Sequence, residues 1–182
     1  ILVPTTMLEQ RSKKRIKTDK RDAEIIAKCL AQHNYSSVHI PTAKDEETKE
    51  FLRMRDDHKL ALKKIKQQIL AFCLRHSYRY DGKSHWTAAH LKWLRSLTPE
   101  DLYKEILDEY LLTYQNLSDK LERMDKRIEE LASLEEYREA VKKLCCFIGV
   151  RTHTALSVLV EVGDFKRFAS AKNFASYLGL VP

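Results

Sequence analysis

Residues 107–131, LDEYLLTYQNLSDKLERMDKRIEEL, decide the fold of this chain. Apolar side chains recur there at alternating intervals of three and four residues, which is the spacing of a coiled coil. Charged residues such as Glu122, Lys126 and Arg127 flank these positions. We therefore predict a long helix with one hydrophobic seam. The seam consists of Leu107, Tyr110, Tyr114, Leu117, Leu121, Met124, Ile128 and Leu131.

The seam needs a partner, and the sequence leaves two open. One is a second helix of the same chain, predicted over residues 45–76, where Leu62, Ile65 and Ile69 keep helical spacing. The other is a second copy of the chain. A coiled coil can combine both, so we expect an antiparallel helical arm and a homo-oligomer that pairs through the seam.

Start signals precede both predicted helices. Residues 42–45, Thr-Ala-Lys-Asp, resemble a capping box. Residues 98–101, Thr-Pro-Glu-Asp, offer Thr98 as N-cap and Pro99 as the first helical residue. We therefore expect the seam helix to begin at Pro99.

The composition agrees with a mainly α fold. The 182 residues include only four glycines and four prolines, and 43% are hydrophobic. No apolar run is long enough to cross a bilayer, so no membrane partner is expected. The chain begins at Ile1 rather than Met, and we expect it to be a piece of a longer protein.

Charge is concentrated at the two ends of the chain. The net charge is +7; residues 1–30 carry eight cations and four acids, residues 141–182 carry six and two, and the middle is close to neutral. Two separate basic regions favour a polyanion as partner, most simply nucleic acid. Ordinary solubility is the alternative explanation.

The cysteines and histidines indicate no zinc site. Cys29, Cys73, Cys145 and Cys146 form no CxxC pair, so we expect buried thiols in a reducing cytoplasm. The histidines of residues 76–90 also lack zinc spacing.

An acidic pair lies inside the first basic region. Asp19 and Asp22 are three residues apart, so a helix that starts near Thr18 brings them to one face. Two carboxylates can bind Mg²⁺, and surrounding cations can hold a phosphate chain. The alternative is structural, with Asp19 as N-cap and Asp22 as the third helical residue. The cations are Arg11, Lys13, Lys14, Arg15, Lys17, Lys20 and Arg21.

The last forty residues change character. A dense apolar stretch is interrupted at residues 148–152, Ile-Gly-Val-Arg-Thr, which predicts helix, tight turn and helix. Such a corner can direct backbone N–H groups, with Arg151 and Thr152, at a DNA phosphate. It can equally be a packing corner. Gly163 is expected to end the second helix, and Ser170 to cap a short one that Gly179 stops.

Both ends carry a family resemblance. Lys17-Thr18-Asp19-x-x-Asp22-Ala23 resembles the second half of the acidic quartet of DEDD-type insertion-sequence transposases, a family that includes Piv-like invertases and bridge-RNA-guided recombinases. Residues 149–182 resemble the opening of the same family's transposase domain, through Gly149-Val150-x-Thr152, Glu161-Val162-Gly163-Asp164 and Ala175-Ser176-Tyr177-x-Gly179-Leu180-x-Pro182. Arg151 stands where family hairpins often have a second glycine.

The resemblance implies three parts. Residues 1–41 would be the C-terminal piece of an RNase-H/RuvC-like α/β domain, residues 42–140 a helical coiled-coil arm, and residues 141–182 the start of a helix-hairpin-helix-like all-α domain. Asp19 and Asp22 would be catalytic ligands of Mg²⁺. The remaining two acids and a nucleophilic serine would lie outside this segment.

We therefore expect a fragment of a bacterial or archaeal cytoplasmic enzyme that cleaves and rejoins DNA strands, with a structured guide RNA as a second partner. The alternative is a non-catalytic module that binds nucleic acid and dimerises. A plain coiled-coil scaffold is a third class, which failure to bind any nucleic acid would favour.

Overall fold

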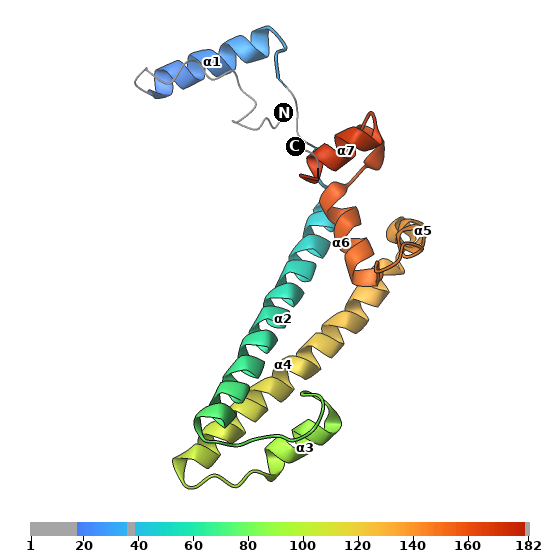
Figure 1. Cartoon of the computed structure of the whole chain (residues 1–182). Coiled ribbons are helices and arrows are strands. Elements are labelled where there is room, and N and C mark those ends of the chain that lie inside the picture. The colour runs from blue at the N-terminus through green and yellow to red at the C-terminus, as the bar shows by residue number, and fades with distance from the viewer. Residues whose placement is uncertain (1–17, 36–38, 181–182) are drawn as a thin grey trace. The chain divides into compact units, whose positions relative to one another are not determined.

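A computed structural model describes residues 18–35 and 39–180 (Figure 1). These residues form α-helices and one 3-10 helix, and no strand occurs among them. The chain divides into two units, residues 1–43 and residues 44–182. The mainly α fold predicted from composition is confirmed for the described residues. None of the helices in this part of the chain is long and apolar enough to cross a membrane.

Two long antiparallel helices form the frame of the second unit (Figure 1). They are α2 (Ala43–Arg75) and α4 (Leu102–Ala132), and neither contains glycine or proline. α3 (Ala88–Ser96) lies at one end of this hairpin, and α5 (Glu135–Leu144) and α6 (Thr152–Val162) lie at the other. Of the two predicted partners for the seam helix, the structure therefore shows the helix of the same chain, α2.

The hairpin contributes to two separate hydrophobic cores. The α3 core consists of Ile65, Ile69, Phe72, Cys73, Leu94, Leu107 and Tyr114. The α6 core consists of Leu52, Ile128, Ala132, Tyr137, Val141, Ala155, Leu156 and Val160. Each core uses α2, α4 and the short helices at its own end, so the hairpin is covered by a third layer at its two ends.

All eight seam residues are buried or half-buried inside the single chain. Leu107 and Tyr114 belong to the α3 core, and Ile128 belongs to the α6 core. Leu121 and Met124 are also buried, and along α4 they lie between the residues of the two cores. Their apolar surface is therefore already removed from water without a second copy.

The start of α4 differs from the prediction. Asp101 is its N-cap and has φ +46°, so the helix begins at Leu102 rather than Pro99. A positive φ is incompatible with a right-handed helix. Pro99 is buried instead. Packing of the proline therefore overrides its preference for the first helical turn.

The C-terminal end signals are confirmed. Gly163, with φ +68°, follows the last residue of α6. The Ser170 hydroxyl accepts a hydrogen bond from the Asn173 N–H at 3.2 Å and so caps α7 (Ala171–Tyr177). Between them lies the 3-10 helix η2 (Phe165–Arg167). The Arg167 guanidinium lies 4.4 Å and 4.7 Å from the ring centres of Phe168 and Tyr177, which ties η2 to α7.

The domain boundary predicted between residues 140 and 141 falls inside α5. Tyr137 and Val141 of this helix are both in the α6 core. The Tyr137 hydroxyl donates a 2.7 Å hydrogen bond to Asp45, the acid of the predicted capping box. Burial and this hydrogen bond raise the pKa of Tyr137 to about 12. Residues on both sides of the boundary thus pack as one body with the start of α2.

The predicted burial of all four cysteines is wrong for two of them. Cys29 and Cys73 are buried, whereas Cys145 and Cys146 are exposed. The exposed pair lies in the turn after α5, where Val141 and Leu144 before it and Val150 after it occupy the positions against the core. Apolar composition alone does not distinguish the turn from the helix.

α1 (Asp19–Ala31) is the described helix of the first unit. The spacing of Ala23, Ile26, Ala27 and Leu30 predicts one apolar stripe on this helix. These four side chains are exposed, and Cys29 is buried instead. No other helix occurs among the described residues of this unit to cover the stripe. Residues 1–4, Ile-Leu-Val-Pro, have the apolar composition expected for the end of a buried strand, and they lie outside the described residues.

Candidate functional site

The acidic pair lies in the first turn of α1. Thr18 is the N-cap, and its carbonyl oxygen accepts hydrogen bonds from the N–H groups of Arg21 at 3.0 Å and Asp22 at 3.1 Å. The proposed N-cap role of Asp19 is therefore wrong, because Asp19 is already helical. Both acids remain favourable there, since the positive end of the helix dipole attracts anions.

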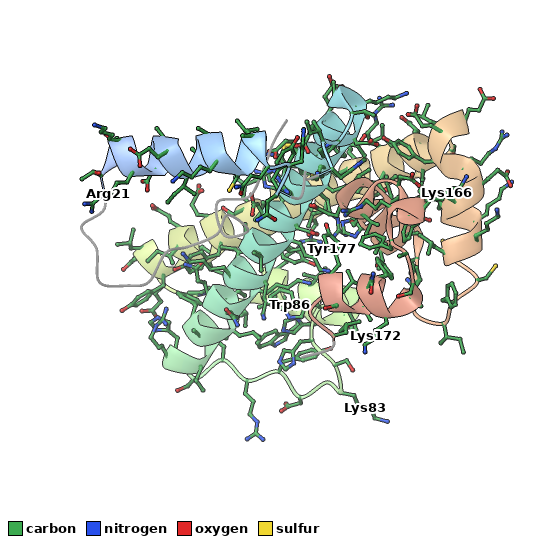
Figure 2. The ribbon with its side chains drawn as sticks, turned by 90° about the horizontal axis from the view of Figure 1, so that it is seen from above. Arg21, Lys83, Trp86, Lys166, Lys172 and Tyr177 are labelled. Atoms are coloured by element: carbon green, nitrogen blue, oxygen red, sulfur yellow. The ribbon has the colours of Figure 1, made fainter. Side chains whose placement is uncertain are left out.

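The cations next to the pair lie on another face of the helix. Lys20 and Arg21 line a groove of about 470 Å³ together with Thr18 and Glu24, and neither aspartate lines it. At 100° per residue, positions 20, 21 and 24 turn away from positions 19 and 22. Arg21 extends from the start of the helix (Figure 2). These two cations therefore lie on a different face of α1 from the two carboxylates.

Two carboxylates supply only part of a magnesium shell. Mg²⁺ prefers six oxygen ligands in octahedral geometry. No group of three or more His, Cys, Asp or Glu that could hold a metal occurs in residues 18–35 and 39–180. Asp19 and Asp22 thus have the right chemistry for two ligands and need further donors. The predicted cations Arg11, Lys13, Lys14, Arg15 and Lys17 lie outside the described residues.

The second predicted binding region is the corner between α5 and α6. Gly149 in this corner has φ +86°, and a Cβ there would meet no atom within 4 Å. Glycine is therefore needed for its backbone conformation rather than for space. Arg151 is the exposed N-cap of α6 and makes no side-chain capping bond, and Thr152 is half-buried. The helix N-terminus and Arg151 are thus placed at the same corner.

The corner also carries several positively charged side chains. Residues 140–160 contain Lys142, Lys143 and Arg151 but no Asp or Glu. Phe147 and Ile148 at the turn are both exposed. Lys142 lies 3.3 Å from Glu139, so Lys143 and Arg151 are the cations of residues 140–160 that have no ion pair within the described part of the chain.

Ion pairs and a histidine–aspartate contact connect α6 to the hairpin. Glu161 lies 3.1 Å from Arg53 and 3.8 Å from Lys49, both on α2. At the other end of α6, His153 Nε2 lies 3.4 Å from an oxygen of Asp56. Burial lowers the pKa of His153, partly offset by the negative charge of Asp56. The corner therefore has a fixed position relative to α2.

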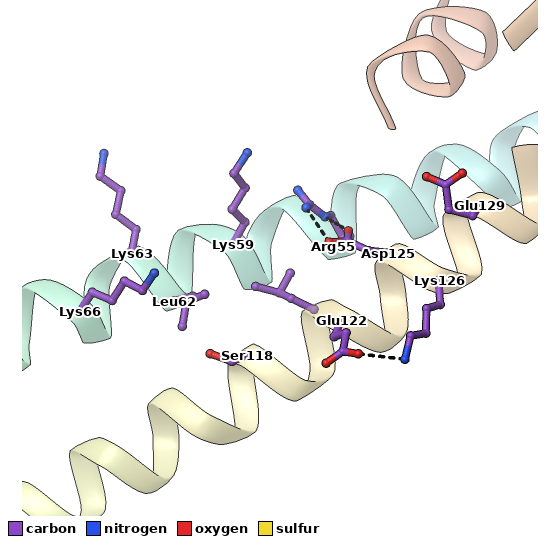
Figure 3. Close-up of a pocket in the computed structure, with 11 residues that line it drawn as sticks. Arg55, Lys59, Leu62, Lys63, Lys66, Ser118, Glu122, Asp125, Lys126 and Glu129 are labelled. Carbon is purple, nitrogen blue, oxygen red and sulfur yellow. Dashed lines mark hydrogen bonds and ion pairs between the residues drawn. The ribbon is translucent and has the colours of Figure 1, made fainter. Parts of the chain in front are cut away.

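The structure shows a third basic feature that the sequence analysis missed. An open groove of about 740 Å³ runs between the middle parts of α2 and α4 (Figure 3). Lys59, Lys63 and Lys66 line it from α2, and Glu122 and Asp125 line it from α4. The sequence does contain a sign of this basic feature, because residues 58–80 include six Lys or Arg and no acid. Averaging charge over the whole middle of the chain concealed this stretch.

Comparison with known proteins agrees with the expected family. Residues 141–182 match the sequence model of the Transposase IS116/IS110/IS902 family. The chain is 34% identical to the transposase for insertion sequence element IS1533 of Leptospira borgpetersenii, over 91% of this chain and 49% of the relative. It is 26% identical to the pilin gene-inverting protein of Moraxella bovis, over 92% of this chain and 43% of the relative.

The chain thus spans about half the length of the curated relatives it matches. No solved structure matches it. Along nearly its whole length it is similar to a transposase of an insertion sequence and to a gene-inverting protein, and its residues 141–182 carry the sequence pattern of the Transposase IS116/IS110/IS902 family.

Proposed function

We propose that this chain is part of a transposase that cuts and rejoins DNA strands. The observation that carries the proposal is the similarity to an insertion-sequence transposase, at 34% identity over 91% of the chain. The gene-inverting relative supports strand exchange as the reaction, since inversion of a DNA segment requires cutting and rejoining.

Asp19 and Asp22 would contribute two carboxylates to a magnesium site, with the other two acids of the quartet supplied from outside this sequence. Bound Mg²⁺ would stabilise the negative charge that develops on the phosphate during strand cleavage. The resemblance also implies a nucleophilic serine outside the sequence. Within this chain, both aspartates lie in the first turn of α1, one helical turn apart, so their carboxylates share one face of the helix.

DNA and a structured guide RNA would be the partners. At the corner between α5 and α6, the free N–H groups of the first turn of α6 and the Arg151 guanidinium would contact a phosphate. This is a helix-hairpin-helix type of contact, with Arg151 in place of a glycine. Lys143, which has no ion pair among the described residues, would add long-range attraction.

Substitution of the acidic pair in the complete protein tests the proposal. We expect Asp19→Asn and Asp22→Asn each to lower the rate of strand exchange about 100-fold or more, because each removes a charge that would hold the metal at the reacting phosphate. The measurement is recombination of a plasmid substrate together with Mg²⁺ binding by calorimetry.

Glu24→Gln is the matched control. Glu24 lies on the same helix but lines the groove with Lys20 and Arg21 rather than sharing a face with the two aspartates. Near-normal strand exchange by both aspartate variants would refute the metal role. If Glu24→Gln lowered the rate of strand exchange as much as the aspartate variants do, the loss would be a general effect of charge rather than of metal binding.

A second function is nucleic-acid binding and assembly without catalysis, with two copies paired through their long helices. The eight seam residues are buried or half-buried within one chain, so pairing through the buried ones requires two chains to exchange α2 or α4. Sedimentation equilibrium distinguishes a single chain from a pair, because two chains that exchange helices have twice the 21.3 kDa mass of one chain. Steep salt dependence of nucleic-acid binding without Mg²⁺-dependent cleavage in the complete protein would favour this function.

A further inference from the structure

The hairpin has an uneven distribution of charge along α2. All the acids of this helix lie between Asp45 and Asp57, and none follows. In the first half, Lys44, Lys49, Arg53 and Arg55 each pair with a carboxylate. In the second half, Lys59 and Lys63 have no carboxylate within ion-pair distance among the described residues. The helix is therefore neutralised over one half and positive over the other.

The unpaired lysines lie on one side of the helix. Positions 59, 63 and 66 follow the i, i+4, i+7 spacing of a single face and extend over about 10 Å. All three line the groove between α2 and α4, and the side chains of Lys59 and Lys63 extend away from α4 (Figure 3). Lys66 instead directs its ammonium toward Tyr114 of α4. We call these three residues, which share one face of α2, the lysine row.

The opposite wall of the groove does not cancel this charge. Glu122 pairs with Lys126 at 2.8 Å, and Asp125 pairs with Arg55 at 2.8 Å. Glu129 is the remaining acid of that wall. Since two of the three carboxylates already have cations of their own, the groove offers an excess of positive charge to whatever enters it.

An aromatic surface marks the end of the row. The ammonium of Lys66 lies 5.3 Å from the ring centre of Trp86 and 5.7 Å from that of Tyr114. These cation–π contacts hold Lys66 in position without neutralising its charge. At the other end, Arg55 is fixed by Asp125. Lys66 is thus held at one end of the row, Arg55 is paired just beyond the other end, and Lys59 and Lys63 remain available.

We propose that the lysine row binds the sugar–phosphate backbone of a nucleic acid along the hairpin. The inference rests on the proposed function for the identity of the partner, but it assigns a surface distinct from the acidic pair and from the corner between α5 and α6. A row of ammonium groups contacts phosphates without reading bases, so the contact is independent of sequence.

The test uses the triple variant Lys59→Gln, Lys63→Gln, Lys66→Gln. Its control is Lys64→Gln, Lys120→Gln, Arg123→Gln, which removes the same charge from exposed positions of α2 and α4 that do not line the groove. The probes are a short DNA duplex and a single-stranded RNA of equal length. Fluorescence anisotropy gives the affinity of the whole chain for each between about 50 mM and about 200 mM salt.

We expect the triple variant to lower the slope of log affinity against log salt by about 2 to 3, because each lost phosphate contact removes a little less than one unit. The control should retain most of the slope of the unsubstituted chain. The probe with the larger loss identifies the row as an RNA or a DNA contact. A double variant, Lys59→Gln and Lys63→Gln, retains the Lys66 contacts with Trp86 and Tyr114, and should lower the slope by about 2.

Equal slopes for the triple variant and its control would overturn this inference and leave the proposed function intact. A change in sedimentation mass without a change in slope would also overturn it, because the groove would then bind a second copy of the chain. If the unsubstituted chain binds neither probe at low salt, nucleic-acid binding by this segment fails as a whole, and the lysine row fails with it. Circular dichroism of each variant confirms that the helices remain folded.

Discussion

His90 shows at the scale of one residue how burial decides chemistry. It is fully buried at the start of α3, where its Nδ1 accepts a 3.1 Å hydrogen bond from the Trp86 N–H. Its Nε2 has no hydrogen-bond partner in the described part of the chain. Burial, and then the nearby positive charge of His85, lower the pKa of His90 below the ordinary 6.5. The side chain is therefore held neutral as a packing residue.

This predicts a pH dependence of stability. The unfolded chain takes up a proton at His90 near pH 6.5, whereas the folded chain resists it. The free energy of unfolding should therefore fall as the pH drops below 6.5, until the lower folded pKa is reached. Urea denaturation at pH 7.5 and pH 5 measures the loss.

His90→Asn keeps an acceptor near the position of Nδ1 but cannot be protonated, so it should lose less stability between the two pH values. Some dependence should remain, because burial lowers the pKa of His153 as well. An unchanged difference between the two pH values in the variant would show that His90 does not contribute.

At the candidate site, residue spacing predicted the positions of the two acids but not the face on which the neighbouring cations lie. The three-residue interval correctly placed Asp19 and Asp22 in the first turn of a helix. It did not show that Lys20 and Arg21 line a different face, although the same 100° rotation implies it. Proximity in sequence therefore does not by itself place these two cations beside the carboxylates.

At the scale of elements, α2 has a buried stripe and an exposed one. Ile69 is 0% exposed in the α3 core, whereas Leu74 on the same helix is 81% exposed. Hydrophobic spacing predicted the buried stripe, because Ile65, Ile69 and Phe72 repeat at three- and four-residue intervals. The position of Leu74 on the outer face follows from the same period.

We expect Ile69→Ala to lower the free energy of unfolding by about 2 to 5 kcal/mol, through lost burial and the cavity left in the core. Leu74→Ala removes a side chain of similar size from water-exposed surface and should change it by less than about 0.5 kcal/mol. Urea denaturation measures both. Similar losses in the two variants would mean that the outer face of α2 is covered in solution.

At the scale of the whole chain, α2 and α4 connect two cores that share no residue. Ile69 belongs to the α3 core and Ile128 to the α6 core. Both helices are continuous between the cores, so the hairpin should unfold as one unit. Sites that are far apart and share no neighbours contribute independently to stability even within one cooperative unit.

Ile69→Val and Ile128→Val should each lower the free energy of unfolding by about 0.5 to 1.5 kcal/mol. The double variant should lose the sum to within about 0.5 kcal/mol, in a single transition followed by circular dichroism. Two separate transitions would show that the cores unfold independently. A loss clearly different from the sum would show that strain passes between them along the helices.

The sequence by itself determined the helical class, the two long helices and most of their ends, because hydrophobic period, glycine position and capping chemistry act between near neighbours in the chain. Tertiary structure decided that α2 covers the seam, that α4 begins at Leu102, that Cys145 and Cys146 are exposed, and that three lysines share a groove. These outcomes depend on which distant residues come together. Spacing along the chain gives the face of a helix on which a side chain lies, but burial and ion pairing depend on what packs against that face.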